Sequence, residues 1–145
     1  MNIQSEDIKK FNYLVKETDA LYHEYALSCN ITDSVAEILY VISSIGEGCS
    51  QRDICRLSGS SKQTINSAIK KMEREGMLNL RPGHGRINTI YLTERGKNLA
   101  EEKIAPLIKM ENEVLDSWSD KDRKELLRLT ERYLVELRQK IDEKS

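Results

Sequence analysis

The sequence predicts a mainly α-helical protein of one domain with a single small β-hairpin. Its 145 residues include only two prolines and seven glycines, so few residues interrupt helices. Apolar residues recur at helical spacing through most of the chain and alternate only in the segment after Gly76. Apolar residues make up 39% and charged residues 32%, a balance typical of a globular domain with much solvated helix surface and not of a disordered chain.

Two helices are expected before the first glycine. Residues 7–27 have apolar residues near helical spacing and no proline or glycine, which predicts one long helix. Thr32 or Asp33 can cap a second helix that ends at Gly46. Its wide apolar face predicts that it is buried, and that face comprises Val35, Ile38, Leu39, Ile42 and Ile45.

Two shorter helices joined by a tight turn follow. Ser50 with Asp53 forms a capping-box pattern, which predicts a helix to about Leu57. Ser60 with Gln63 forms a second such pattern, which predicts a helix that ends at Gly76. The apolar face of this second helix comprises Ile65, Ile69 and Met72.

The last third of the chain contains the hairpin and two long helices. Alternating residues on both sides of the segment 82–85, which reads Pro-Gly-His-Gly, predict the β-hairpin. Thr93 is expected to cap a helix that runs to about Trp118 with a bend at Pro106. Ser119 is expected to cap the final helix, which again has one apolar face.

Residues 51–68 meet the steric demands of a helix-turn-helix. Cys55 is small enough for a close helix crossing, and Gly59 can adopt the positive φ of the turn. Apolar residues that can hold the two helices together are Ile54, Ile65 and Ala68. An ordinary helical hairpin with glycine in its turn is the alternative interpretation.

The charge of the chain is unevenly distributed. Its formal net charge is -1, but residues 50–95 carry nine Lys/Arg and four Asp/Glu, whereas the remainder carries 14 and 20. A basic centre between acidic flanks indicates a surface that meets a polyanion. The alternative is a chance fluctuation of charge along the chain.

The outward face of the second short helix is polar and basic, with acids only near its end. Gln and Asn can form paired hydrogen bonds to adenine, Ser and Thr can bind base or phosphate, and Lys and Arg can reach phosphates. The residues expected to bind DNA from this helix are Ser61, Lys62, Gln63, Thr64, Asn66, Ser67, Lys70 and Arg74. The hairpin adds Arg81 and Arg86, of which Arg86 is the first candidate for the minor groove; an exposed turn arginine without a partner is the alternative.

The order of these elements resembles the MarR family of bacterial transcriptional regulators over nearly the whole chain. The stretches that carry the resemblance are QRDICRLSGSSKQTINSAIKKMEREGML at 51–78 and YLTERG at 91–96. The resemblance implies a winged helix-turn-helix fold with N- and C-terminal dimerisation helices. Within a single domain, 1–145, it places the DNA-binding lobe at residues 32–93 and the dimerisation helices at residues 1–31 and 94–145.

The resemblance further implies a sequence-specific homodimer that binds double-stranded DNA at a pseudo-palindromic operator, as a ligand-responsive repressor. The residues support pairing independently, because the terminal helices have more apolar area than a monomer of this size needs. These apolar residues are Ile8, Phe11, Val15, Leu127, Tyr133, Leu134, Leu137 and Ile141. Closure of one monomeric core is the alternative.

The wing departs from the family pattern in one respect. Wings of this family usually carry an Asp-x-Arg element whose acid orients the arginine at the tip. Arg86 matches that arginine, but the aspartate has no counterpart and His84 stands where an acid is expected. The wing is also shorter.

Regulation in this family usually comes from a small aromatic ligand or an oxidised cysteine. Candidates to line an effector pocket are Tyr22, His23, Tyr25, Cys29 and Tyr40, although such an aromatic stripe is more often core packing. Cys29 has no cation beside it in sequence to stabilise a thiolate. Zinc sensing through His23, Glu24 and Cys29 is the weaker alternative.

Other classes of protein have less support. The three cysteines form no CxxC pair, and the first residues show no export signal, so we expect a cytoplasmic protein with reduced thiols. We find no catalytic triad pattern, no phosphate-cradling glycine loop and no paired carboxylates, and therefore expect neither an enzyme nor a bound cofactor or metal. A winged-helix module that binds protein is a further alternative, against which the basic recognition face counts.

Overall fold

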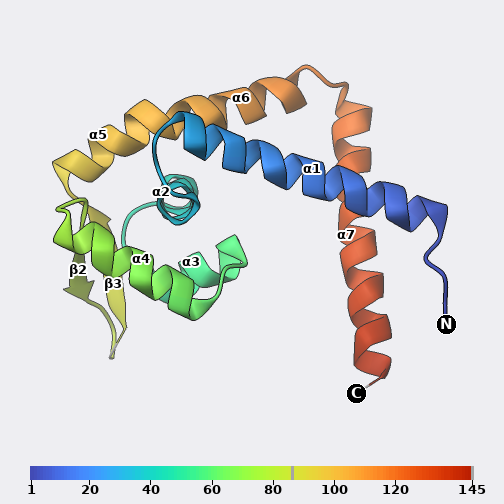
Figure 1. Ribbon diagram of the computed structural model, residues 1–145, viewed down its shortest axis with the longest axis horizontal. Helices are drawn as coiled ribbons and strands as arrows, with labels where there is room; N and C mark the ends of the chain where they lie inside the picture. Colours follow the sequence, from blue (N-terminus) through green and yellow to red (C-terminus); the bar gives the residue numbers. More distant parts are fainter. Residues whose placement is uncertain (86, 145) are drawn as a thin grey trace. The chain divides into compact units, whose positions relative to one another are not determined.

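The structure is a computed structural model that describes residues 1–85 and 87–144 (Figure 1). The chain divides into two compact units, Met1–Ala105 and Pro106–Ser145. The helices of the first unit are α1 (Glu6–Ser28), α2 (Asp33–Ile45), α3 (Gln51–Ser58), α4 (Lys62–Arg74) and α5 (Glu94–Lys103). Its strands are β1 (Cys49–Ser50), β2 (Leu78–Pro82) and β3 (Asn88–Leu92). The predicted mainly helical fold with a β-hairpin wing is therefore confirmed.

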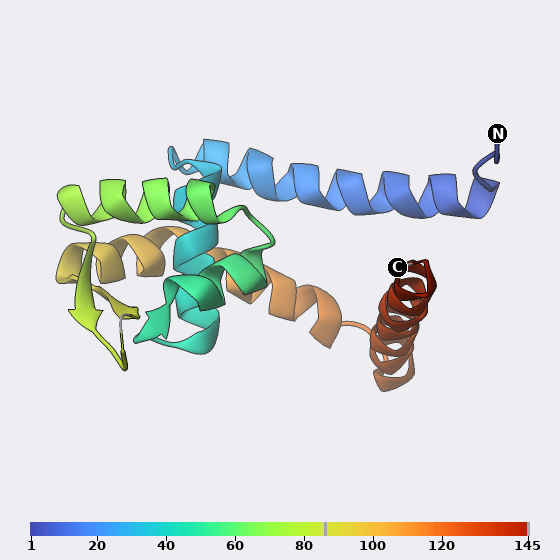
Figure 2. The same cartoon turned by 90° about the horizontal axis from the view of Figure 1, so that it is seen from below.

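The hairpin belongs to a three-stranded antiparallel sheet with the order β1-β3-β2. Leu80 pairs with Ile90 in the hairpin, and Cys49 of β1 pairs with the other side of Ile90. Figure 2 shows the hairpin of β2 and β3 extending away from α4. Strand β1 was not predicted, because two residues are too few to show alternation.

Hydroxyl side chains cap most helices of the chain. The predicted caps Thr32, Ser50 and Thr93 accept hydrogen bonds from the backbone N–H three residues on, and Ser50 with Asp53 forms the predicted capping box. The predicted cap at Ser60 is wrong, because Ser61 caps α4. The backbone N–H of Ser60 donates instead to the Ser58 hydroxyl, 3.1 Å away, which keeps Ser60 within the turn.

Two glycines end helices as predicted. Gly59 has φ of 70° between α3 and α4, and Gly76 has φ of 74° after α4. Both angles lie in the left-handed region that glycine adopts at little cost. They fix the helix-turn-helix and the entry into the wing.

The hydrophobic core lies beneath α4 and the sheet. The largest side chains with under 2% exposure are Ile38, Leu39, Ile54, Ile65, Ile69, Met72, Leu78, Ile90 and Ile104. Burial of each such side chain stabilises the fold by about 1.5 to 3 kcal/mol. The expected burial of α2 is confirmed for most of its apolar face, but Ile45 is 45% exposed because it lies in the last turn.

The expected long helix after Thr93 is divided into α5 and α6 (Ala105–Asp116). The break falls at Ile104, two residues before Pro106, whose missing N–H cannot continue the helix. The second unit holds α6 from Pro106 onward and α7 (Asp120–Glu143), which Ser119 caps as predicted. In the described part of the chain, no helix is both long and apolar enough to cross a membrane.

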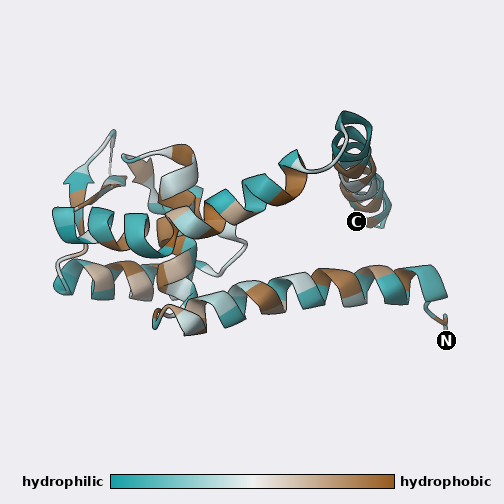
Figure 3. Ribbon diagram, turned by 90° about the horizontal axis from the view of Figure 1, so that it is seen from above, coloured by the Kyte–Doolittle hydropathy of each residue, from teal (hydrophilic) through white to brown (hydrophobic). Residues whose placement is uncertain are grey.

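Many apolar side chains of the long helices are exposed. No described residue of α6 or α7 is buried. On α7, Leu127 is 64% exposed, Leu134 56% and Ile141 60%, and on α1 Leu14 is 50% exposed. Figure 3 shows apolar segments recurring along both helices. Each of these helices thus presents apolar surface that its own unit does not cover.

One half-buried acid of α2 gives a pH-dependent prediction. Burial, and then the charges of Asp19 and Asp33, raise the pKa of Glu37. Because the pKa of Glu37 is higher in the folded than in the unfolded protein, its contribution to stability is fully present below the unfolded pKa. That contribution is lost as pH rises through the folded pKa. Glu37→Gln is therefore expected to raise the melting temperature at pH 7 relative to the original chain, with a smaller gain at pH 4. Thermal melts against the exposed control Glu24→Gln check this, and an equal gain at both pH values would contradict it.

Candidate nucleic-acid interface

Helix α4 has one buried face and one exposed face. Its inward side chains Ile65, Ile69 and Met72 are at most 1% exposed. They pack in the core with α2 and α3. The opposite face is therefore held outward by a rigid support, as a recognition helix requires.

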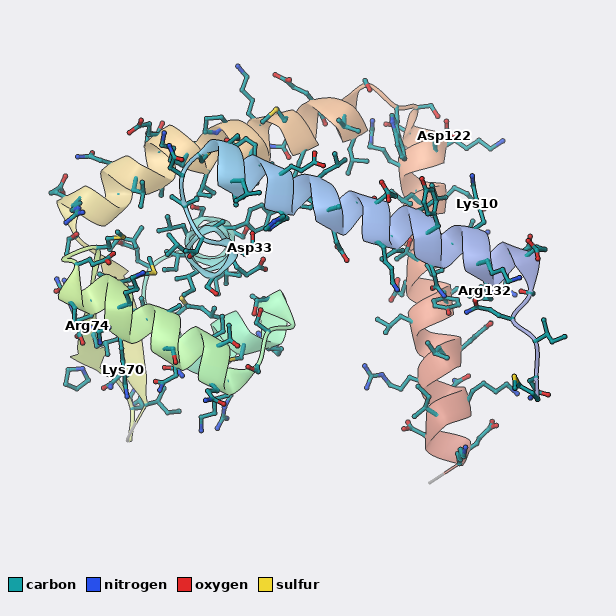
Figure 4. All side chains as sticks on the ribbon, in the orientation of Figure 1. Lys10, Asp33, Lys70, Arg74, Asp122 and Arg132 are labelled. Atoms are coloured by element: carbon teal, nitrogen blue, oxygen red, sulfur yellow. The ribbon has the colours of Figure 1, made fainter. Side chains whose placement is uncertain are left out.

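The DNA-binding residues predicted on α4 lie mainly on this outer face. Asn66 is half-buried, and the exposed residues are Ser61, Lys62, Gln63, Thr64, Ser67, Lys70 and Arg74. Figure 4 labels Lys70 and Arg74, which extend from α4 on the side away from α2. The structure thus brings these side chains onto one surface, which we call the recognition face.

The basic side chains of α4 pair with no acid that the structure describes. Within residues 1–85 and 87–144, no ion pair involves Lys62, Lys70, Lys71 or Arg74. Helix α7 contrasts with this, because Arg128 and Arg132 both pair with glutamates. The first turn of α4 also has no acid to offset the positive end of the helix dipole. The recognition face therefore has an uncompensated positive charge.

The first turn of α4 is ordered by two hydroxyls. The Ser61 hydroxyl accepts from the Thr64 N–H at 3.1 Å and donates to Thr64 Oγ1 at 2.8 Å. Both hydrogen bonds of the Ser61 hydroxyl are therefore made to Thr64, and Ser61 serves as the cap of α4. Lys62 and Gln63 remain exposed beside it.

The end of α4 is attached to the first turn of α5. Thr93 Oγ1 donates to the Gly76 carbonyl, and Arg95 Nη1 donates to the Glu75 carbonyl, each at 2.6 Å. Gly96 lies so close to Met77 that an added Cβ would overlap the Met77 carbonyl oxygen. We call these contacts of Thr93, Arg95 and Gly96 the α4–α5 joint. Sequence reasoning noted this stretch but missed its contacts with the end of α4.

The structure describes one of the two arginines predicted to bind DNA from the wing. Arg81 is exposed on β2, and its guanidinium carbon lies 4.0 Å from the centroid of the Tyr91 ring. No ion pair of the described residues includes Arg81. Arg86, the first candidate for the minor groove, lies outside the described residues.

The residues considered for an effector or sensor lie near the junction of α1 and α2. His23 Nδ1 lies 2.7 Å from an Asp33 carboxylate oxygen, and the Tyr25 hydroxyl donates to the Lys103 carbonyl at 2.7 Å. Cys29 and Cys55 are half-buried, and Cys49 is buried in β1, where burial raises the pKa of its thiol. No group of three or more His, Cys, Asp or Glu among the described residues is placed to hold a metal ion.

A comparison with known protein families matches the part of the chain that contains the helix-turn-helix. Residues 30–87 match the sequence profile of the MarR family. Over these residues the chain is similar to the MarR family. We call residues 30–87 the MarR-type segment. It contains α2, β1, α3, α4 and β2, and therefore includes the recognition face. The comparison with curated protein sequences gave no match.

Solved structures extend the likeness of fold beyond the MarR-type segment. A MarR family regulator from Neisseria meningitidis has a TM-score of 0.84 and 17% identity, covering 97% of this chain and 100% of that one. A MarR family transcriptional regulator from Silicibacter pomeroyi has a TM-score of 0.72 and 12% identity, covering 90% and 89%. The MepR–DNA complex of S. aureus has a TM-score of 0.68 and 18% identity, covering 88% and 93%. At these identities the likeness shows the winged-helix fold.

Proposed function

We propose that the protein is a transcription regulator that binds specific sequences of double-stranded DNA through the recognition face of α4. The observation that carries the proposal is the exposed positive charge of Lys62, Lys70 and Arg74, which form no ion pair with any described residue, on a helix supported by the core. A surface of this charge releases counterions when it meets phosphates, which favours binding. The MepR–DNA complex shares this fold, which supports the proposal.

The polar residues of α4 supply sequence preference in this proposal. Gln63, Asn66 and Ser67 lie between the basic residues along the helix. An α-helix fits the major groove, where amides can form paired hydrogen bonds to adenine. The basic residues then fix the helix on the phosphates while these polar side chains reach base edges.

Asn66→Ala tests the assignment of base contact. We expect the variant to lose preference at one base position at a cost of about 1 to 3 kcal/mol on the preferred duplex, with little loss on random DNA. Competition titrations with duplexes that carry single base changes measure this. Equal loss on preferred and random DNA would remove Asn66 from base contact.

We also propose that the protein acts as a homodimer through α1, α6 and α7. The exposed leucine and isoleucine side chains of α7 support this, because such apolar surface is usually covered in an oligomer. Two-fold symmetry then presents two recognition faces to half-sites about one helical turn apart.

Binding across a promoter would make the protein a repressor. An aromatic ligand that contacts Tyr22, Tyr25 or Tyr40 near the α1–α2 junction would be the signal that releases it from DNA.

A titration of the full chain by fluorescence anisotropy tests the proposed function. The probes are the duplex that the protein enriches from a random library and an unselected duplex, each at several salt concentrations. We expect tight, salt-sensitive binding of two protomers per preferred duplex that resists unselected competitor. Absence of binding to any duplex at low salt would overturn the proposal and favour a module that binds protein.

A further inference from the structure

The outer face of the wing holds an arginine against an aromatic ring. In the register of the hairpin, Arg81 pairs with Thr89 and Asn79 pairs with Tyr91. Paired residues of an antiparallel ladder share a face, so Arg81 and Tyr91 are diagonal neighbours on one side. Leu78 and Ile90 are buried on the other side. The contact of 4.0 Å between the guanidinium carbon and the ring centroid therefore lies on the outward side of the sheet.

The Tyr91 ring is itself held in place. Its hydroxyl lies against Gly48, where an added Cβ would come within 3.0 Å of it. The loop before β1 is tied to β3 on both sides of Tyr91: the Gly48 N–H donates to the Ile90 carbonyl at 2.8 Å, and a Glu47 carboxylate oxygen accepts from the Leu92 N–H at 3.0 Å. The ring thus stands between a fixed loop and the Arg81 side chain.

An arginine held in this way keeps its hydrogen-bonding edges. Guanidinium stacks on an aromatic ring through its flat face, so its N–H groups remain directed outward. No acid of the described residues pairs with Arg81. The stack therefore restricts the motion of a long side chain and leaves its charge available to an external anion.

We propose that Tyr91 is a positioning residue for Arg81, holding its guanidinium on the outer face of the wing so that it binds a backbone phosphate of DNA. This inference rests on the proposed function, because it assigns a role in DNA binding. Arg81 makes the contact with the phosphate, and Tyr91 acts only through Arg81. In this proposal an aromatic ring orients the arginine of the wing, and no acid of the described residues takes part.

A double-mutant cycle tests this inference. The full-length chain, Arg81→Ala, Tyr91→Leu and the double variant are titrated on the duplex enriched by the original chain, at several salt concentrations. We expect Tyr91→Leu to weaken binding about two- to five-fold, the range of an exposed cation–π contact. Arg81→Ala is expected to weaken binding at least as much and to make the salt slope about 0.9 less negative, as for one lost phosphate contact. In the Arg81→Ala background, Tyr91→Leu is expected to change nothing further.

Two controls separate positioning from a structural role. Tyr91→Phe keeps the ring and is expected to bind like the original chain, with the same salt slope. The Arg81 δ-methylene protons are expected to show an upfield ring-current shift in the NMR spectra of the original chain and Tyr91→Phe, and to lose it in Tyr91→Leu. This readout needs no DNA, so it reports the stack whether or not the variants bind.

The outcomes distinguish this inference from the proposed function. An equal effect of Tyr91→Leu with and without Arg81 overturns the positioning role while leaving DNA binding intact. An absent ring-current shift in the original chain overturns the stack itself. Failure of the original chain to bind any duplex at low salt overturns the proposed function and the positioning role together.

Discussion

Leu134→Glu is expected to convert the protein into a monomer and to weaken its binding to the preferred duplex by about 100-fold or more. Leu134 is 56% exposed on α7, between Leu127 and Ile141 at intervals of seven residues. In the proposed homodimer this side chain is covered by the partner, where a carboxylate would be buried without a counter-charge. Loss of the dimer removes the second recognition face, and with it the gain from binding two half-sites at once.

Sedimentation equilibrium measures the change of mass, and anisotropy titration measures the change of affinity. Gln139→Glu is the matched control, because it introduces the same charge on the same helix and well away from Leu134 around the helix axis. We expect that control to remain dimeric and to bind normally. A Leu134→Glu variant that remains dimeric would contradict the assignment of α7 to the interface.

Gly96→Ala is expected to destabilise the fold by about 1 to 3 kcal/mol, the usual cost of overpacking. An added Cβ would overlap the Met77 carbonyl oxygen, and backbone at that point cannot move without shifting the start of β2. The melting temperature is expected to fall by roughly 2 to 12 °C for a chain of this size. Because glycine-to-alanine changes inside helices normally stabilise, the sign of the effect is itself diagnostic.

The same variant should weaken DNA binding, because the α4–α5 joint attaches the end of the recognition helix to α5. Asn98→Ala is the matched control, since Asn98 is exposed on the same helix and alanine favours helix there. We expect no fall in its melting temperature. Thermal melts followed by circular dichroism measure both melting temperatures. A Gly96→Ala variant as stable as the control would show that the close approach to Met77 does not require glycine at position 96.

Local patterns predicted much of the fold. Thr32, Ser50 and Thr93 were identifiable as caps because each acts on a backbone N–H only three residues away. The same pattern wrongly predicted Ser60 as the cap of α4, where Ser61 is the cap. Adjacent serines offer the same hydroxyl, and only the geometry of the turn determines which of them caps the helix. The two-residue strand β1 depends on pairing with a strand some 40 residues later, which no local pattern reports.

In the candidate site too, local patterns predicted some features, whereas others depend on contacts between residues far apart in the sequence. The recognition face of α4 followed from helical spacing, because the residues opposite Ile65 and Ile69 must face outward when those two are buried. The contact between Arg81 and Tyr91 required the register of the hairpin, which depends on the conformation of its turn. Likewise, the hydrogen bond from Arg95 to the Glu75 carbonyl connects the first turn of α5 to the end of α4. The wing separates these two residues in the sequence, so no spacing pattern predicts the bond.

A dimethyl sulfate footprint of the full chain on its preferred duplex tests the central claim most directly. The reagent methylates guanine N7 in the major groove and adenine N3 in the minor groove, so it reports which groove the protein occupies. We expect two groups of protected guanine N7 atoms separated by about one helical turn, as two copies of α4 in successive major grooves require. Protection confined to adenine N3, or a single protected major-groove segment, would contradict a dimer that reads DNA through the recognition face.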